Sequence, residues 1–206
     1  GFSLTQSKSD KMRSRIINAF DKFLDVSSHT DYEISEVSKK LEIDIAVDLM
    51  GFTKLNRFGI FLKGCAPIQI NYLGYAGTIG GDFIDYILAD EILISENEKK
   101  YYGEKVICLP NCYQANPKDL EISNEKISRL DFGLPENKIV FCNFNSSYKI
   151  TPTMFTAWTN IMKKIPDSVL WLMESEGNST SENIWKEAEK RNIDRKRIVF
   201  TKHMNR

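Results

Sequence analysis

The segment 145–152, Asn-Ser-Ser-Tyr-Lys-Ile-Thr-Pro, carries residue types that suit a bound anion. It lies between an expected strand over 138–144 and an expected helix that Thr151 would cap. The N–H groups and dipole of a helix N-terminus favour negative charge, and Lys149 and Ser146 would add a cation and a hydroxyl donor. The pattern predicts a phosphate site, although an ordinary capped turn with a solvent-facing lysine explains the same residues.

A second candidate is the glycine-rich segment 73–81, Leu-Gly-Tyr-Ala-Gly-Thr-Ile-Gly-Gly, which follows an expected strand. Glycines let a backbone approach a ligand closely and leave N–H donors accessible. The spacing departs from the G-x-G-x-x-G pattern of dinucleotide-binding proteins. Tight turns between strands therefore explain the segment at least as well as a ligand does.

The third candidate is Asp48, which ends an expected strand and opens the turn 48–53, Asp-Leu-Met-Gly-Phe-Thr. A carboxylate at that place could orient a sugar hydroxyl or relay a proton. Aspartate is equally suited to capping the turn that follows it, and this structural role is the favoured interpretation.

The elements that would position these segments alternate between strand and helix patterns. Helices are expected over 9–24, 32–41, 54–62, 152–164 and 182–191, and strands over 43–49, 67–73, 83–90, 104–110, 138–144, 168–173 and 197–200. This alternation predicts an α/β protein with parallel sheets, in which ligands bind beyond the carboxyl ends of the strands. The polar stretch 111–137, with a short helix expected near 123–131, separates two Rossmann-like lobes over 1–114 and 115–206.

The composition of the chain does not favour nucleic-acid binding, membrane insertion or a zinc site. Lysine plus arginine and aspartate plus glutamate both number 28, so no net charge favours nucleic acid or an anionic membrane. No run approaches the roughly 20 apolar residues that span a bilayer. The four cysteines, Cys65, Cys108, Cys112 and Cys142, lack zinc-site spacing and fit free thiols in a reducing compartment. The expectation is a cytoplasmic protein with no bound metal.

Three stretches taken together resemble the O-GlcNAc transferase and SPINDLY family. The stretch 51–90 is similar to the family's N-terminal catalytic lobe, with Gly-Phe-Thr, Pro-Ile-Gln and Leu-Gly-Tyr-Ala-Gly-Thr in order. The stretch 101–116 resembles the end of that lobe, and 138–173 resembles the start of the C-terminal lobe through Cys-Asn-Phe-Asn-x-x-Tyr-Lys. The resemblance implies a GT-B architecture of two Rossmann-like lobes, both incomplete in this chain. It also implies inverting transfer of a sugar, N-acetylglucosamine or in some members fucose, from a nucleotide donor to protein Ser/Thr hydroxyls without a metal.

The resemblance carries over to particular residues. Lys149 falls on the lysine that contacts the donor diphosphate, and it is expected with Asp48 to take part in the reaction. The other expected donor-binding positions are Tyr148, Ser146, Leu73, Gly74, Thr53 and Arg206. There are departures from the family pattern: Ala76 and Cys65 each stand in place of a proline, and Ser146 in place of a phosphate-contacting glutamine.

Motifs that the family needs lie outside this sequence. Its catalytic-lobe histidine is expected before residue 1, and its His-Thr-Thr stretch after Arg206. We therefore expect the chain to be inactive alone, with a nucleotide-sugar donor and a protein acceptor as partners of the whole enzyme. Unpaired strand edges predict self-association. The alternative function is a non-catalytic scaffold or interaction protein that keeps the fold without binding a donor.

Overall fold

The computed structural model describes residues 1–6, 10–118, 123–174 and 179–202. Contacts divide the chain into Gly1–Leu120, called unit 1 below, and Glu121–Arg206, called unit 2. Arg206 lies outside the described residues. Among the helices of the described part, none is long and apolar enough to cross a membrane. The division into lobes at residues 114 and 115 stays a prediction.

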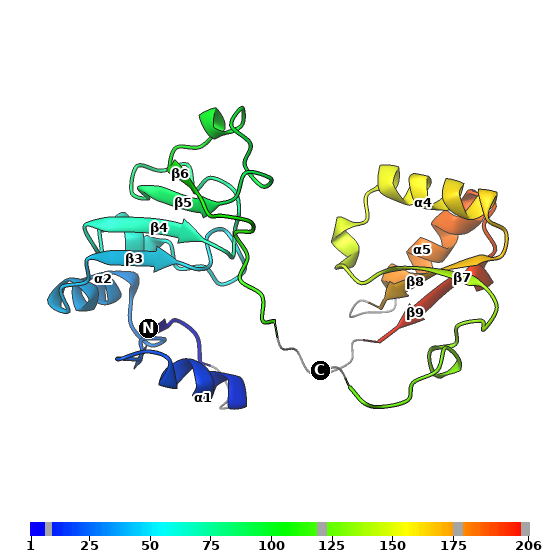
Figure 1. Cartoon of the computed structure of the whole chain (residues 1–206), viewed down its shortest axis with the longest axis horizontal. Helices are drawn as coiled ribbons and strands as arrows, with labels where there is room; N and C mark the ends of the chain where they lie inside the picture. The colour runs from blue at the N-terminus through cyan, green and yellow to red at the C-terminus, as the bar shows by residue number, and fades with distance from the viewer. Residues whose placement is uncertain (7–9, 119–122, 175–178, 203–206) are drawn as a thin grey trace. The chain divides into compact units, whose positions relative to one another are not determined.

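Unit 1 holds a four-stranded parallel sheet in the order β3-β4-β5-β6, and its strands lie side by side in Figure 1. Its elements are β1 (Phe2–Ser3), α1 (Lys11–Asn18), β2 (Leu24–Asp25), α2 (Asp31–Lys40), β3 (Ile45–Asp48), α3 (Gly59–Leu62), β4 (Ile68–Tyr72), β5 (Tyr86–Ala89), a 3-10 helix (Lys99–Tyr101) and β6 (Lys105–Cys108). Strands β1 and β2 form a separate parallel pair. The predicted parallel α/β fold is confirmed.

One face of this sheet packs against helices α2 and α3. The core there joins Ile34 of α2 with Ile60 and Phe61 of α3, and Ala46 of β3 packs against them. Thr30 and Glu33 start α2 with a reciprocal capping box, which satisfies backbone N–H groups at the helix N-terminus. Because side chains alternate along a strand, Asp48 is on the same face as Ala46 and is buried there.

The opposite face of the sheet is apolar and open. Ile45 and Val47 of β3 are 52% and 44% exposed, and the register places them beside Ile68 and Ile70 of β4. Ile107 of β6 is also exposed. Parallel sheets ordinarily have both faces covered, so this surface is unusual for a parallel sheet.

Three expected helices differ from the structure, and the one expected over 54–62 is confined to α3, Gly59–Leu62. The pattern over 9–24 predicts a helix that ends near residue 24, but α1 ends at Asn18, and Met12, Ile16 and Phe20 are exposed. Periodicity predicts that a helix has an apolar face, but it does not predict which surface covers that face. Among the described residues of unit 1, none buries the apolar face of α1. In the described part of 123–131, the structure has no α-helix; a single 3-10 turn follows over Leu130–Phe132.

Unit 2 holds a three-stranded parallel sheet in the order β7-β8-β9. Its elements are β7 (Ile139–Asn143), a 3-10 turn (Ser147–Lys149), α4 (Pro152–Lys164), β8 (Ser168–Met173), α5 (Ser179–Lys190), a 3-10 turn (Arg195–Arg197) and β9 (Ile198–Thr201). Helix α4 has the predicted bounds, and the Thr151 hydroxyl accepts a hydrogen bond from the Met154 N–H. Phe155 and Met162 of α4 bury against Leu170, Leu172 and Ile198 of the sheet.

Candidate functional site

The candidate residues of unit 1 gather at the carboxyl ends of β3 and β4. Asp48 is the last residue of β3, and the register pairs it with Asn71 of β4. The turn 48–53 follows the first strand and the glycine-rich segment 73–81 follows the second. Both segments therefore lie at the same carboxyl edge of the parallel sheet, the edge at which ligands bind in open α/β folds.

The two segments touch closely. A Cβ added to Gly74 would lie well under 3.0 Å from the carbonyl oxygen of Leu49 and 3.1 Å from Cα of Met50, so only glycine fits there. The ring of Phe52 also packs edge-on against Tyr75, with centroids 5.5 Å apart. The backbone at Gly74 is thus held against the turn that Asp48 begins.

Asp48 has a structural task at this edge. Its side chain is 6% exposed, and its Oδ1 accepts a hydrogen bond from the Met50 N–H at 2.9 Å. This bond confirms the capping interpretation of Asp48. Thr53 is half-buried nearby, and its carbonyl oxygen accepts hydrogen bonds from Asn56. The structure thus places Asp48, Thr53, Leu73 and Gly74 in one region of unit 1.

Two polar side chains that no sequence pattern predicted, Glu104 and Tyr102, form hydrogen bonds to the glycine-rich segment. The Glu104 carboxylate accepts bonds from the Thr78 hydroxyl and the Ile79 N–H, both at 2.6 Å. The Tyr102 hydroxyl donates to the carbonyl oxygen of Ala76 at 3.2 Å, and burial raises the pKa of Tyr102. Glu104 is 4% exposed. One signal was available: Glu104 is a carboxylate at the start of the strand expected over 104–110.

Asp90 likewise forms hydrogen bonds to loop backbone, here in the segments that follow β5 and β6. Its carboxylate accepts bonds from the N–H groups of Ile92, Leu93 and Tyr113, at 3.0, 2.8 and 2.8 Å. These backbone donors, that of Tyr113 first, hold the pKa of Asp90 below its usual range. The loop after β6 is thereby fixed to the end of β5, in the same sheet that bears the candidate residues.

In unit 2 the candidate residues form the connection from β7 to α4. Ser146 precedes the 3-10 turn that contains Tyr148 and Lys149, and all three are exposed, Tyr148 by 81%. The Lys149 N–H donates to the carbonyl oxygen of Ser146 at 3.0 Å, which fixes the turn. No carboxylate of the described residues pairs with the Lys149 ammonium group.

The first turn of α4 leaves little of its N-terminus open. Pro152 has no N–H, and the Met154 N–H is bound by Thr151. Thr153 is left as the first-turn residue whose N–H has neither an intrahelical acceptor nor the cap. A bound anion here would thus meet one backbone N–H of α4 together with the Lys149 side chain.

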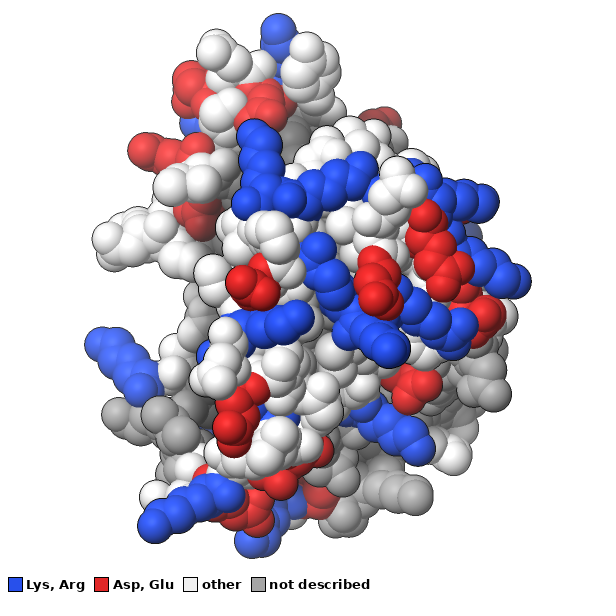
Figure 2. Space-filling view, turned by 90° about the vertical axis from the view of Figure 1, so that its right-hand side faces the viewer, with Lys and Arg blue, Asp and Glu red and all other residues white. Residues whose placement is uncertain are grey.

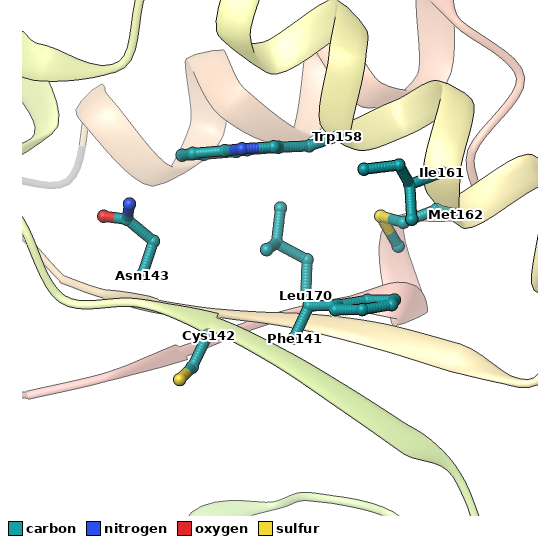
Figure 3. Close-up of a pocket in the computed structure, with 7 residues that line it drawn as sticks. All are labelled: Phe141, Cys142, Asn143, Trp158, Ile161, Met162 and Leu170. Atoms are coloured by element: carbon teal, nitrogen blue, oxygen red, sulfur yellow. The ribbon is translucent and has the colours of Figure 1, made fainter.

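Two cavities flank this connection. The first, of about 260 Å³, lies between β7 and α4; in Figure 3 Trp158 covers Leu170 and Asn143, while Cys142 points to the other side of the strand. Its lining is mostly apolar, so it offers packing space and no acid–base pair. The second, of about 320 Å³, lies between α4 and α5 and is lined by Tyr148, Thr151 and Arg191 among others. It adjoins the Lys149 turn directly.

Charge and metal-ligand chemistry limit what the site can do. On the face in Figure 2, cationic and anionic side chains are interspersed. In unit 2, Arg191 pairs with Glu187 and Arg195 with Glu182. The four cysteines are free thiols, and burial raises the pKa of Cys65. Within the described ranges, no cluster of three His, Cys, Asp or Glu side chains could hold a metal ion.

Comparison with known proteins places both units in one family. The model described as Glycosyl transferase family 41 matches residues 1–120 and 114–206. A probable UDP-N-acetylglucosamine–peptide N-acetylglucosaminyltransferase SEC of Arabidopsis thaliana is 37% identical over 177 residues, covering 84% of this chain and 18% of that protein. A probable SPINDLY transferase of Solanum lycopersicum is 27% identical, covering 80% of this chain and 17% of its own length.

A solved structure agrees. A mutant O-GlcNAc transferase of Thermobaculum terrenum matches with a TM-score of 0.86 and 26% identity, over 100% of this chain and 38% of that one. The chain therefore spans less than a fifth of these two plant relatives and well under half of the bacterial structure. The α/β fold with parallel sheets matches the GT-B catalytic region of that neighbour.

Proposed function

The chain belongs to glycosyl transferase family 41, and we propose that it forms part of an inverting enzyme that transfers N-acetylglucosamine from a UDP-sugar to protein Ser/Thr hydroxyls. The names of the relatives support the donor and the peptide acceptor. The observation that carries the proposal is Lys149, which lies exposed beside the N-terminus of α4 and has no carboxylate partner among the described residues. Since the chain spans a small part of those relatives, catalysis belongs in the proposal to the whole protein and not to this chain alone.

Lys149 has a defined chemical task in the proposed reaction. As the bond between sugar and diphosphate breaks, negative charge grows on the leaving diphosphate. A lysine ammonium group and the Thr153 N–H would stabilise that charge more in the transition state than in the ground state. In the proposal, Tyr148 on the same turn and Ser146 just before it make further contacts to the donor. Arg206 stays a predicted nucleoside contact.

Unit 1 would supply the contacts to the sugar in this proposal. Leu73 and Gly74 are exposed at the carboxyl edge of the sheet, and Thr53 lies on the neighbouring turn. Asp48 holds that turn through Met50. A direct role for Asp48 in relaying the acceptor proton stays a prediction, and Asp48→Asn tests it by separating charge from shape.

The proposed transfer needs no metal, because the Lys149 side chain and the Thr153 N–H take the place of a divalent ion at the diphosphate. Activity of the full-length protein that withstands a chelator such as EDTA would support this, and loss of activity would contradict it. The free thiols fit a reducing compartment, so a cytoplasmic location is part of the proposal.

The decisive experiment is calorimetric titration of UDP into the full-length protein, comparing wild type, Lys149→Ala and Lys164→Ala. Lys164 is an exposed lysine at the other end of α4, so it controls for loss of charge alone. Lys149→Ala should weaken binding by about 1–3 kcal/mol, roughly 5- to 150-fold in Kd, and Lys164→Ala should not. If the wild type binds neither UDP nor GDP, the non-catalytic scaffold becomes the better interpretation.

We also propose that this chain associates with itself when it is separated from the rest of the protein. The open sheet face at Ile45, Val47 and Ile68 supports this, as do the unpaired edges of β3 and β7. An apolar face and a free strand edge both gain stability from a second chain.

A further inference from the structure

Asn71 is a fully buried polar side chain at the end of β4, with 0% of its surface exposed. Its Nδ2 donates to two backbone carbonyl oxygens of the glycine-rich segment, that of Tyr75 at 3.1 Å and that of Gly77 at 3.2 Å. Its Oδ1 finds no hydrogen-bond donor among the described residues. The hydrogen bonds of the Asn71 side chain therefore hold the backbone of the segment that follows it.

The Asn71 side chain also borders the other candidate turn. Gly51 has a left-handed backbone, with φ of 53°, and a Cβ there would lie 2.6 Å from Cβ of Tyr75 and 3.4 Å from Oδ1 of Asn71. The α-carbon of Gly51 therefore faces the carbonyl end of the Asn71 amide. Phe52, the next residue, packs on Tyr75. The backbone over 73–77, called the 73–77 arc below, is therefore the surface against which the turn 48–53 rests.

Burial of the Asn71 amide at this position is energetically unfavourable. Leaving Oδ1 without a donor is unfavourable, and an apolar side chain of the same shape would avoid that cost. Retention of an asparagine is explained if the two carbonyl contacts do something that an apolar residue cannot. They tie Tyr75 and Gly77 back to Asn71, and so close a short loop that passes through Leu73 and Gly74.

We propose that Asn71 is a positioning residue that locks the 48–53 turn and the 73–77 arc together, and so fixes Leu73 and Gly74 where the donor sugar binds. The inference rests on the proposed function for the sugar contact, while the lock itself rests on this chain's geometry alone. Leu73 has a left-handed φ of 71°, a backbone state that leucine rarely adopts without support. The bonds from Asn71 to the next residues along the arc supply that support.

The first test measures the lock in this 206-residue chain. Asn71→Leu keeps the shape and removes both donors; the control Ile87→Val trims a buried core residue that the register places beside Asn71. Amide hydrogen exchange should rise roughly 30-fold, the size expected for two lost hydrogen bonds of ordinary strength. The reporters are the N–H groups of Gly74 and Met50, which bond to Tyr72 and Asp48.

The Ile79 N–H, which Glu104 holds independently, should keep its exchange rate in Asn71→Leu and serves as an internal reference. Unchanged exchange at both Gly74 and Met50 would overturn the lock. A rise at Ile79 equal to that at Gly74 would also overturn it, because general destabilisation would then explain the effect.

The second test separates sugar contact from nucleotide contact in the full-length protein. In Asn71→Leu, the Kd for UDP-N-acetylglucosamine should rise about tenfold while the Kd for UDP alone stays within about twofold, because the proposed diphosphate contact is in unit 2. Ile87→Val should change neither. Equal weakening of both ligands, or of neither, overturns the positioning role. Failure of the wild type to bind either ligand overturns the proposed function, and the exchange result still decides the lock.

Discussion

Replacing Gly74 by alanine tests the contact between the two candidate segments of unit 1. The backbone of Gly74 does not have a positive φ, so alanine can adopt it. At such a position a glycine-to-alanine change by itself stabilises a protein by about 0.4–1 kcal/mol, because the unfolded chain loses freedom. The sign of the observed effect therefore depends on what the new methyl group meets.

That methyl group would meet backbone. The Leu49 carbonyl oxygen and the α-carbon of Met50 lie in its way, and neither can move by changing a rotamer. Forcing an extra methyl group into a filled site typically costs about 1–3 kcal/mol. Because the obstructing atoms are backbone, the cost should lie in the upper part of this range, about 2–3 kcal/mol. After subtraction of the gain in the unfolded state, Gly74→Ala should lower the free energy of unfolding of unit 1 by about 1–2.5 kcal/mol.

The matched control is Gly103→Ala. Its new methyl group would have a single neighbour within 4 Å, the Thr78 hydroxyl at 3.9 Å, and its φ is not positive. This variant should be neutral or more stable by up to about 1 kcal/mol. Urea unfolding of both variants, followed through amide signals of unit 1, keeps the transition of that unit separate from unit 2. If Gly74→Ala proves as stable as Gly103→Ala, the close packing of the 73–77 arc on the 48–53 turn is wrong.

Three further predictions concern stability and association. Thr151→Ala removes the side-chain cap of α4 and should cost unit 2 about 1 kcal/mol in thermal or urea unfolding, with Thr153→Ala, one residue inside the helix, as the comparison. The lowered pKa of Asp90 gives stability that is present above about pH 4 and is lost as the pH falls through the pKa of the folded state. Wild type should therefore exceed Asp90→Asn in stability at pH 7 and lose that advantage progressively as the pH falls below about 4, with Asp82→Asn, at an exposed position, as the control. Light scattering of this chain should show association that grows with concentration and weakens in Val47→Lys on the open sheet face, and a monomer over a wide concentration range would contradict the proposal.

The sequence predicts the regular elements of this protein well where local signals and burial agree. Helix α4 carries a cap at Thr151, proline at its first position and a buried stripe, and its bounds are as predicted. Helix α1 has the same kind of periodicity, but its apolar residues Met12 and Ile16 are exposed. The difference is a partner surface, which no single helical pattern contains.

The candidate site was predictable in its place but not in its support. Strand ends and glycine spacing predicted Asp48 and the 73–81 segment as separate candidates, each at the end of a strand. The register of β3 and β4 then places both at one edge of the sheet. The sequence patterns did not predict Asn71, Tyr102 or Glu104 as supports. The bonds of Tyr102 and Glu104 reach backbone groups 26 and 25 positions away, so their geometry depends on how the strands pair. Those of Asn71 reach only four and six positions along the chain, but they depend on the course of an irregular loop.

The distribution of these supports separates stability from shape in unit 1. The core residues of the covered sheet face are apolar and account for burial, whereas Asn71, Asp90 and Glu104 are buried polar groups whose bonds go to loop backbone. Losing an apolar core contact lowers the stability of the whole unit. Losing one of the polar contacts first frees a loop that the strands themselves do not hold. Substitutions at Asn71 should therefore alter ligand contacts at conditions where unit 1 remains folded, which a core substitution such as Ile87→Val should not do.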